Sequence, residues 1–82
     1  MNRSIKQKVE QITSQYQSIS ECLEHLKADF EKVYFLDDQI SKLNTNAHIV
    51  ALLGRRKMTE DIVNQIKDLQ KMKSQILNRR TP

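Results

Sequence analysis

The feature that most constrains this chain is a run of apolar residues that recur at alternating intervals of four and three between positions 5 and 33. The spacing holds for four heptads, and neither Gly nor Pro interrupts it. A 3.5-residue repeat keeps one stripe of a helix turned toward a partner, so the run predicts a helix that packs lengthwise against another helix. This stripe, the seam, consists of Ile5, Val9, Ile12, Tyr16, Ile19, Leu23, Leu26, Phe30 and Val33.

The composition excludes several other classes of protein. Eighty-two residues make one domain at most, and a single Gly, a single Pro and four aromatic residues leave little turn chemistry for an all-β fold. The longest apolar run, 49–53, is much shorter than the ~20 residues that a membrane span needs. The first residues lack the apolar core of a secretory signal, and the single cysteine suits a reducing compartment, so we expect a cytoplasmic protein.

The first helix is predicted to span residues 4–43. After Val33 the apolar series continues as Leu36, Ile40 and Leu43, which is a local slip in the heptad phase. Phe35 lies off the stripe in either phase, and we interpret it as part of a second contact surface. The cluster 44–46, Asn-Thr-Asn, is typical of a turn, so it is predicted to end this helix and begin the second arm.

Gly54, the only glycine, allows two interpretations of the second arm. As a helix stop, it separates a helix over 47–53 from a helix over 59–80, with Thr59 as the N-cap of the latter. As a tolerated interior residue, it costs about 1 kcal/mol and leaves one continuous helix over 47–80. The sequence leaves both open.

These elements predict an all-α fold: residues 1–82 form a single helical domain, a long antiparallel hairpin of the coiled-coil type. Ile at d positions and aromatic residues at a positions are unusual in two-stranded coiled coils, so we expect assembly into a broader helical bundle. The residues predicted to form the helix-packing core are Ile12, Tyr16, Ile19, Leu23, Leu26, Phe30, Ile62, Ile66, Leu69 and Ile76. Those predicted to form a partner surface are Tyr34, Phe35, Leu36, Ile49, Leu52 and Leu53.

The sequence favours no catalytic, metal or cofactor site. Cys22 and His25 have a spacing that can supply two metal ligands on one helix, but the only other histidine, His48, lies beyond the predicted turn. A cysteine beside the seam is more often a small buried apolar group. With one glycine, the chain has no turn that could expose a nucleophile or cradle a phosphate. We therefore expect a protein that is not an enzyme.

Positive charge is concentrated in the second half of the chain. Residues 1–46 carry a net charge of −1, and residues 47–82 carry +5. Such a surface attracts phosphates, but no aromatic residue is interleaved with the basic ones to stack on bases, so nucleic-acid binding is the weaker interpretation. The candidate phosphate contacts are Arg55, Arg56, Lys57, Lys67 and Lys71.

The function favoured by these patterns is a non-enzymatic protein–protein interaction module: a small coiled-coil subunit or adaptor of a larger helical complex. Its partner would be another copy of the chain or other helical subunits. Two alternatives stay open. One is a cytosolic chaperone for a secreted or assembling helical protein, and the other is a basic helical hairpin that binds nucleic acid or modulates transcription.

Overall fold

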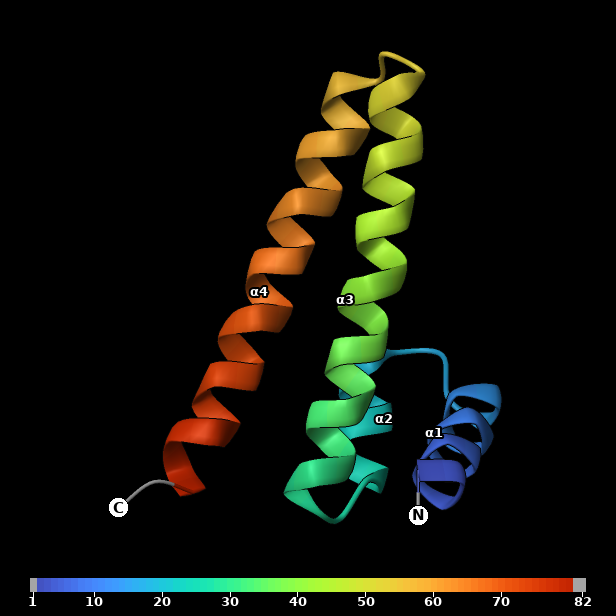
Figure 1. Ribbon diagram of the computed structural model, residues 1–82, viewed down its shortest axis with the longest axis vertical. Helices are drawn as coiled ribbons and strands as arrows, with labels where there is room; N and C mark the ends of the chain where they lie inside the picture. Colours follow the sequence, from blue (N-terminus) through green and yellow to red (C-terminus); the bar gives the residue numbers. More distant parts are fainter. Residues whose placement is uncertain (1, 81–82) are drawn as a thin grey trace. The chain divides into compact units, whose positions relative to one another are not determined.

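The computed structural model describes the backbone of residues 2–80 and the side chains of residues 5–79, and its described elements are all helices. The predicted all-α fold is confirmed. In chain order, the helices are α1 (Asn2–Gln15), α2 (Ile19–His25), α3 (Asp29–Leu52) and α4 (Arg56–Arg80) (Figure 1). The chain divides into two compact units, residues 1–35 and 36–82. No described helix is both long and apolar enough to span a bilayer.

The second unit contains the antiparallel helical hairpin. The helices α3 and α4 run in opposite directions on either side of a short turn (Figure 1). On α3 the buried and half-buried apolar residues recur at intervals of four and three; they are Leu36, Ile40, Leu43, Ala47 and Val50. On α4 the buried and half-buried apolar residues are Ile62, Ile66, Leu69 and Ile76, and half-buried Thr59 and Lys73 complete the same spacing. Matching 3.5-residue stripes are the signature of lengthwise helix packing.

One ion pair links the two helices of this hairpin. Nζ of Lys73 on α4 lies 2.6 Å from Oδ1 of Asp37 on α3. Asp37 would interrupt the stripe if the heptad phase of residues 5–33 continued, but the phase slip after Val33 moves it to the flank. There it pairs with Lys73 while Leu36 becomes fully buried.

The prediction of a turn at 44–46 is wrong, because α3 continues through these residues to Leu52. The Oγ1 of Thr45 donates a hydrogen bond to the carbonyl of Ser41, 3.2 Å away. This bond satisfies the hydroxyl inside the helix, where threonine is otherwise a weak helix former. The cluster that resembled a turn is therefore an exposed stretch of α3.

The helix stop at Gly54 is confirmed, and it is the turn of the hairpin. Gly54 has φ +74°, the only positive φ among the described residues. The Gly54 N–H donates to the Ala51 carbonyl at 3.0 Å, and the Arg55 N–H donates to the Val50 carbonyl at 3.1 Å. These two bonds form a Schellman motif, which places glycine directly after the helix because it carries no Cβ.

The predicted N-cap at Thr59 is wrong, because α4 begins at Arg56. The carbonyl of Arg55 accepts bonds from both the N–H and the Oγ1 of Thr59, at 3.1 and 2.9 Å. Thr59 therefore lies in the first turn of the helix rather than before it, and the turn between α3 and α4 is only three residues long.

The first unit contradicts the prediction of one continuous helix over 4–43, because α1, α2 and the start of α3 are separated by two short breaks. At the first break, Ser18 has an extended backbone and its Oγ accepts the N–H of Glu21 at 3.1 Å. This is an N-cap for α2. The thiol of Cys22 donates to the carbonyl of Tyr16 at 3.5 Å, and the Tyr16 ring stacks on His25 with ring centroids 4.0 Å apart.

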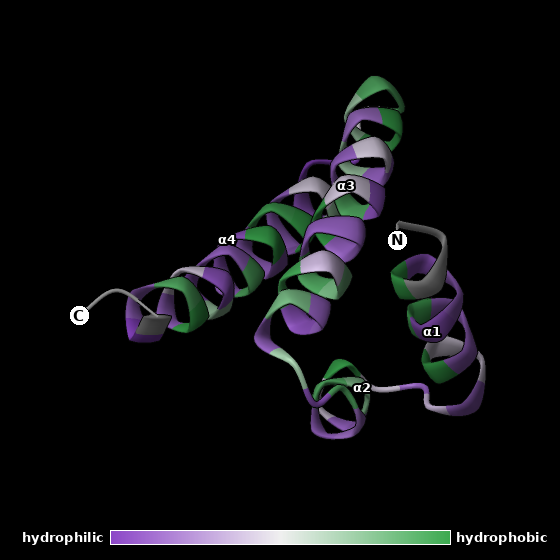
Figure 2. Cartoon of the chain, turned by 60° about the horizontal axis from the view of Figure 1, so that its bottom comes forward, coloured by the Kyte–Doolittle hydropathy of each residue, from purple (hydrophilic) through white to green (hydrophobic). Residues whose placement is uncertain are grey.

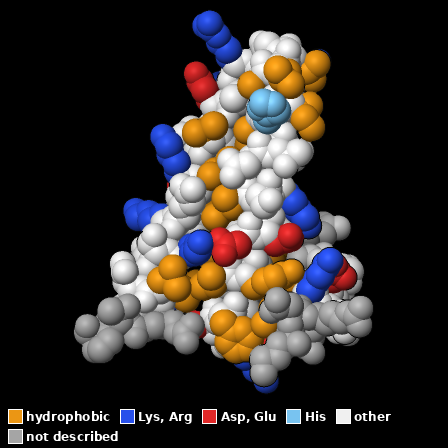
Figure 3. All heavy atoms as spheres, in the orientation of Figure 1, with side chains coloured by type: hydrophobic (Ala, Val, Ile, Leu, Met, Phe, Trp, Pro, Cys, Tyr) orange, Lys and Arg blue, Asp and Glu red, His pale blue; other side chains and the backbone are white. Residues whose placement is uncertain are grey.

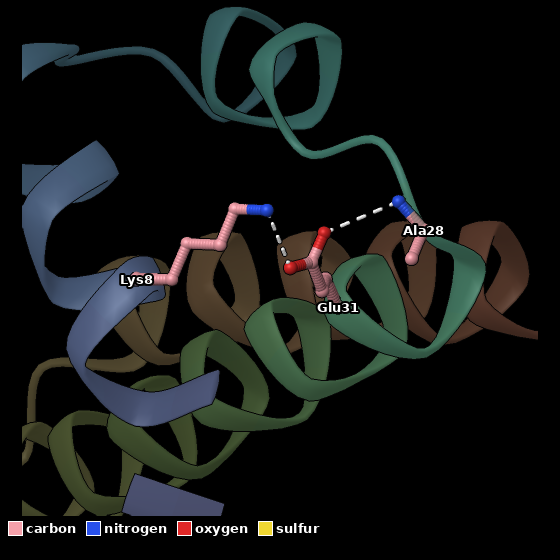
Figure 4. Close-up of polar contacts among 3 residues, drawn as sticks. All are labelled: Lys8, Ala28 and Glu31. Atoms are coloured by element: carbon pink, nitrogen blue, oxygen red, sulfur yellow. Dashed lines mark hydrogen bonds and ion pairs between the residues drawn. The ribbon is translucent and has the colours of Figure 1, made fainter. Parts of the chain in front are cut away.

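A buried glutamate holds the second break. Glu31 accepts a hydrogen bond from the N–H of Ala28 at 3.2 Å, so it caps the start of α3 (Figure 4). Its other carboxylate oxygen lies 2.8 Å from Nζ of Lys8 on α1. The bond from Lys8, with those from the backbone, holds the pKa of Glu31 below its ordinary value of 4.5, against the opposing effect of burial.

Substituting Gly54 tests the turn. An added Cβ would meet nothing within 4 Å, so the cost of Gly54→Ala comes from the left-handed backbone alone. We expect a loss of about 1 kcal/mol in the free energy of unfolding, measured by urea denaturation. Gly54→Asn should lose less, because asparagine tolerates this conformation better. Equal stability of Gly54→Ala and wild type would contradict the turn geometry.

Glu31 predicts a pH dependence of stability. Because its pKa is lowered in the folded state, its contribution is fully present above the unfolded pKa and is lost as pH falls through the folded pKa. Urea midpoints followed from pH 7 downward should therefore drop below about pH 4.5. Glu31→Gln should remove this part of the dependence, and Lys8→Met should make the drop smaller, because it brings the folded-state pKa of Glu31 closer to the unfolded one. An unchanged profile in both variants would show that the pair does not form.

Candidate interaction surface

The predicted core is distributed unevenly between buried and exposed positions. Leu26, Ile66, Leu69 and Ile76 are buried, whereas Ile12, Tyr16, Ile19, Leu23 and Ile62 are half-buried. Phe30 is 50% exposed, so its assignment to the core is wrong in this fold. The first turn of α3 begins at Asp29, and the break before it takes Phe30 out of register with the rest of the seam.

The structure adds buried residues that were not named as core. Val9, Cys22, Phe35, Leu36 and Ile40 are all buried. The burial of Cys22 agrees with its interpretation as a small apolar group, and burial, followed by the nearby Glu21 charge, raises the pKa of its thiol. Among the described residues, no three His, Cys, Asp or Glu side chains gather as metal ligands would.

The predicted partner surface separates into two parts. Phe35 and Leu36 are 1% and 0% exposed, so a role for them as free surface is wrong, and Tyr34 is half-buried. Leu36 is buried because it belongs to the α3 stripe after the phase slip, whereas Phe35, which lies off the stripe in either phase, is buried on another side of the helix. The remaining members, Ile49, Leu52 and Leu53, are exposed at the end of α3.

These three exposed residues form one apolar surface with Met58. Ile49, Leu52 and Leu53 are spaced by three and four residues, so they share a side of the last turns of α3. They are 49%, 76% and 65% exposed, and Met58 in the first turn of α4 is 46% exposed. We call Ile49, Leu52, Leu53 and Met58 the apolar tip. Hydrophobic side chains gather at this end of the hairpin in Figure 3, and the last turns of α3 are strongly hydrophobic in Figure 2.

The apolar tip exists because burial between α3 and α4 declines toward the turn. The fully buried residues of the second unit lie away from the turn; they are Leu36, Ile40, Ile66, Leu69 and Ile76. Nearer the turn, Val50, Thr59 and Ile62 are only half-buried. Two helices alone cannot cover a sequence as apolar as Ala47–Leu53, so part of it faces solvent.

Basic residues border the apolar tip. Arg55, Arg56 and Lys57 are all exposed in and after the turn. The guanidinium Nη1 of Arg55 lies 4.0 Å from Sδ of Met58, which places positive charge directly against the apolar surface. Beside the turn, Arg55 and Arg56 also line a shallow hollow with Ala51, Gly54, Thr59 and Glu60.

The other two candidate phosphate contacts, Lys67 and Lys71, are exposed on α4, one helical turn apart. Lys73 is not available in the same way, because it is engaged with Asp37. Whether any of these residues binds phosphate stays a prediction.

Serine substitutions in the tip should separate binding from folding. Because Leu52 and Leu53 are exposed, the double variant Leu52→Ser/Leu53→Ser should change the free energy of unfolding by no more than about 1 kcal/mol. Leu69→Ala, at a buried position on α4, should cost about 2–5 kcal/mol. Urea denaturation followed by circular dichroism measures both. A large loss in the serine variant would mean that the tip belongs to the core.

Comparison with known proteins gives no relative from which the function of this surface could be inferred. The surface must therefore be interpreted from its own exposure, charge and position at the end of the hairpin. The chain matches no family model, no curated protein and no solved structure.

Proposed function

We propose that the chain is a non-enzymatic interaction module that binds other helical protein subunits through the apolar tip of its α3–α4 hairpin. The observation that carries this proposal is the exposure of Ile49, Leu52 and Leu53, side by side, at the end of α3. Contiguous exposed apolar side chains bordered by polar ones are typical of protein–protein contacts.

The energetics of such a surface suit a helical partner. Fully burying one leucine or isoleucine stabilises a complex by about 1.5–3 kcal/mol, so three or four tip residues can provide the centre of an interface. The spacing of Ile49, Leu52 and Leu53 matches the i, i+3, i+4 pattern by which one helix packs on another. The basic border favours a partner with acidic residues around its own apolar stripe.

The two alternative functions use different features of the molecule. A chaperone for a helical client would use the same apolar tip, so it differs from a stable subunit in how long the partner stays bound. A nucleic-acid-binding hairpin would instead use Lys67, Lys71 and Arg55, and its affinity would fall steeply with salt.

Affinity capture from the source cells tests the proposal. Tagged wild-type chain should retain a defined set of proteins that the Leu52→Ser/Leu53→Ser variant loses. The matched control is Val63→Ser/Met72→Ser, which removes two other exposed apolar residues, each 37% exposed, from α4 outside the tip. The control should keep the same partners, and binding should then be reproduced with the purified partner by calorimetry.

Three results would contradict the interaction module. Capture of the same proteins by wild type and the tip variant would exclude the tip as the contact. Loss of partners in both double variants would indicate non-specific apolar adhesion. Loss only in Lys67→Glu/Lys71→Glu, together with sensitivity to nuclease, would favour the nucleic-acid alternative.

A further inference from the structure

The seam of residues 5–33 is poorly used in the folded first unit, which is unexpected for so regular a heptad pattern. Of its nine residues, only Val9 and Leu26 are buried, and Phe30 is half exposed. The breaks after α1 and α2 place consecutive parts of the seam on three separate helices. The sequence thus contains the apolar pattern of one long packed helix, but in this conformation the seam does not form one continuous stripe.

Nothing in the backbone of the two breaks prevents a helix. They contain neither Gly nor Pro; their residues are Tyr16, Gln17, Ser18, Leu26, Lys27 and Ala28. Ser18 and Leu26 have ordinary extended dihedrals, with φ −93° and −96°, and no described residue except Gly54 has a positive φ. Ser18 and Leu26 could therefore become helical mainly by rotation about ψ, because no residue type in either break is excluded from the helical region.

The polar contacts that hold the breaks are few. At the first break they are the Ser18 cap on Glu21 and the thiol of Cys22 bonded to the Tyr16 carbonyl. At the second, Glu31 caps α3 through the N–H of Ala28 and reaches Lys8 on α1. Lys8 itself is half exposed, so this pair is open to water. The helix α2 has only seven residues, too few to be stable without such support.

We infer that residues 5–33 form a conformational switch: the segment α1–α2 can join α3 as one continuous helix whose seam packs against the same seam of a second copy of the chain. The second copy is the occupant favoured by the sequence, because apolar a and d positions over four heptads are complementary to themselves. This pair is the first step of assembly, and the Ile residues at d and aromatic residues at a allow further copies to join it in a broader bundle. This inference concerns the first unit only and does not depend on the apolar tip.

The two conformations differ by a large distance, which makes the switch measurable. In the folded unit, Nζ of Lys8 and Oε2 of Glu31 are 2.8 Å apart. In a continuous helix the same two residues would be separated by about 35 Å, at a rise of 1.5 Å per residue. Spin labels at the neighbouring positions Gln7 and Lys32 report this change by pulsed electron resonance, in a Cys22→Ser background that keeps a hydrogen-bond donor toward the Tyr16 carbonyl.

The expected result is a short distance in dilute protein and a second, long distance that grows with concentration. By mass action, a tenfold rise in free chain should raise the ratio of long to short populations up to about tenfold. Ser18→Ala removes the α2 cap and should increase the long population at every concentration. Sedimentation of the same samples should show the dimer appearing in step with the long distance.

A proline substitution at Asp29 distinguishes the two conformations most directly. Asp29 is the first residue of α3, where proline is tolerated, but in a continuous helix Pro would remove a backbone hydrogen bond and clash with the preceding turn. Asp29→Pro should therefore abolish the long population and the dimer while keeping the short distance. Asp29→Ala removes the same carboxylate without the ring and should keep the switch.

Either of two results would overturn the inference. One is a single short distance at all concentrations in both wild type and Ser18→Ala. The other is a long population that persists in Asp29→Pro or does not depend on concentration. The double variant of the apolar tip serves as an internal check, because it should leave both distances unchanged.

Discussion

The structure depends on the lengthwise packing of α3 against α4, and that packing depends on a turn of three residues. In a hairpin with so short a connection, the turn decides which residue of one helix lies beside which residue of the other. The left-handed backbone at Gly54 reverses the chain, and the ion pair between Asp37 and Lys73 lies where this alignment requires it. Shifting the turn by one residue would rotate one stripe away from the other, because neighbouring helical positions diverge by about 100°.

The sequence was sufficient to predict an all-α fold with a long antiparallel hairpin, and it offered a helix stop at Gly54 as one of two interpretations. Apolar periodicity predicted helices, and a lone glycine followed by basic residues predicted a C-terminal cap. The predicted bounds of the first arm were wrong, because apolar periodicity contains no information about local helix caps. A seam without Gly or Pro looks continuous, yet Ser18 with Glu21, and Glu31 three residues after Ala28, each satisfy the N–H groups that begin a new helix.

The misplaced turn has a related cause. Asn44, Thr45 and Asn46 have the composition of a turn, but the apolar residues on either side, Leu43 and Ala47, keep the stripe of α3 in register across them. Packing over the length of a helix outweighs the weak preference of three exposed polar residues. The partner surface was only partly predictable. Ile49, Leu52 and Leu53 are exposed because they lie where the hairpin ends, and Leu36 is buried because it joins the α3 stripe after the phase slip. The apolar stripe did not indicate the burial of Phe35, which lies off it in either phase.

The two units of the chain therefore use their apolar residues in different ways. In the second unit, matched stripes on α3 and α4 cover each other and leave an excess only at the tip. In the first unit, the caps and the Lys8–Glu31 pair hold together a fold that leaves most of its heptad seam half-covered. The sequence keeps this seam in strict register although the chain folds into shorter helices, so it is compatible with two arrangements. The balance between them depends on a few polar contacts at the two breaks. Such contacts respond readily to solvent and to a competing helix, whereas a packed apolar core does not.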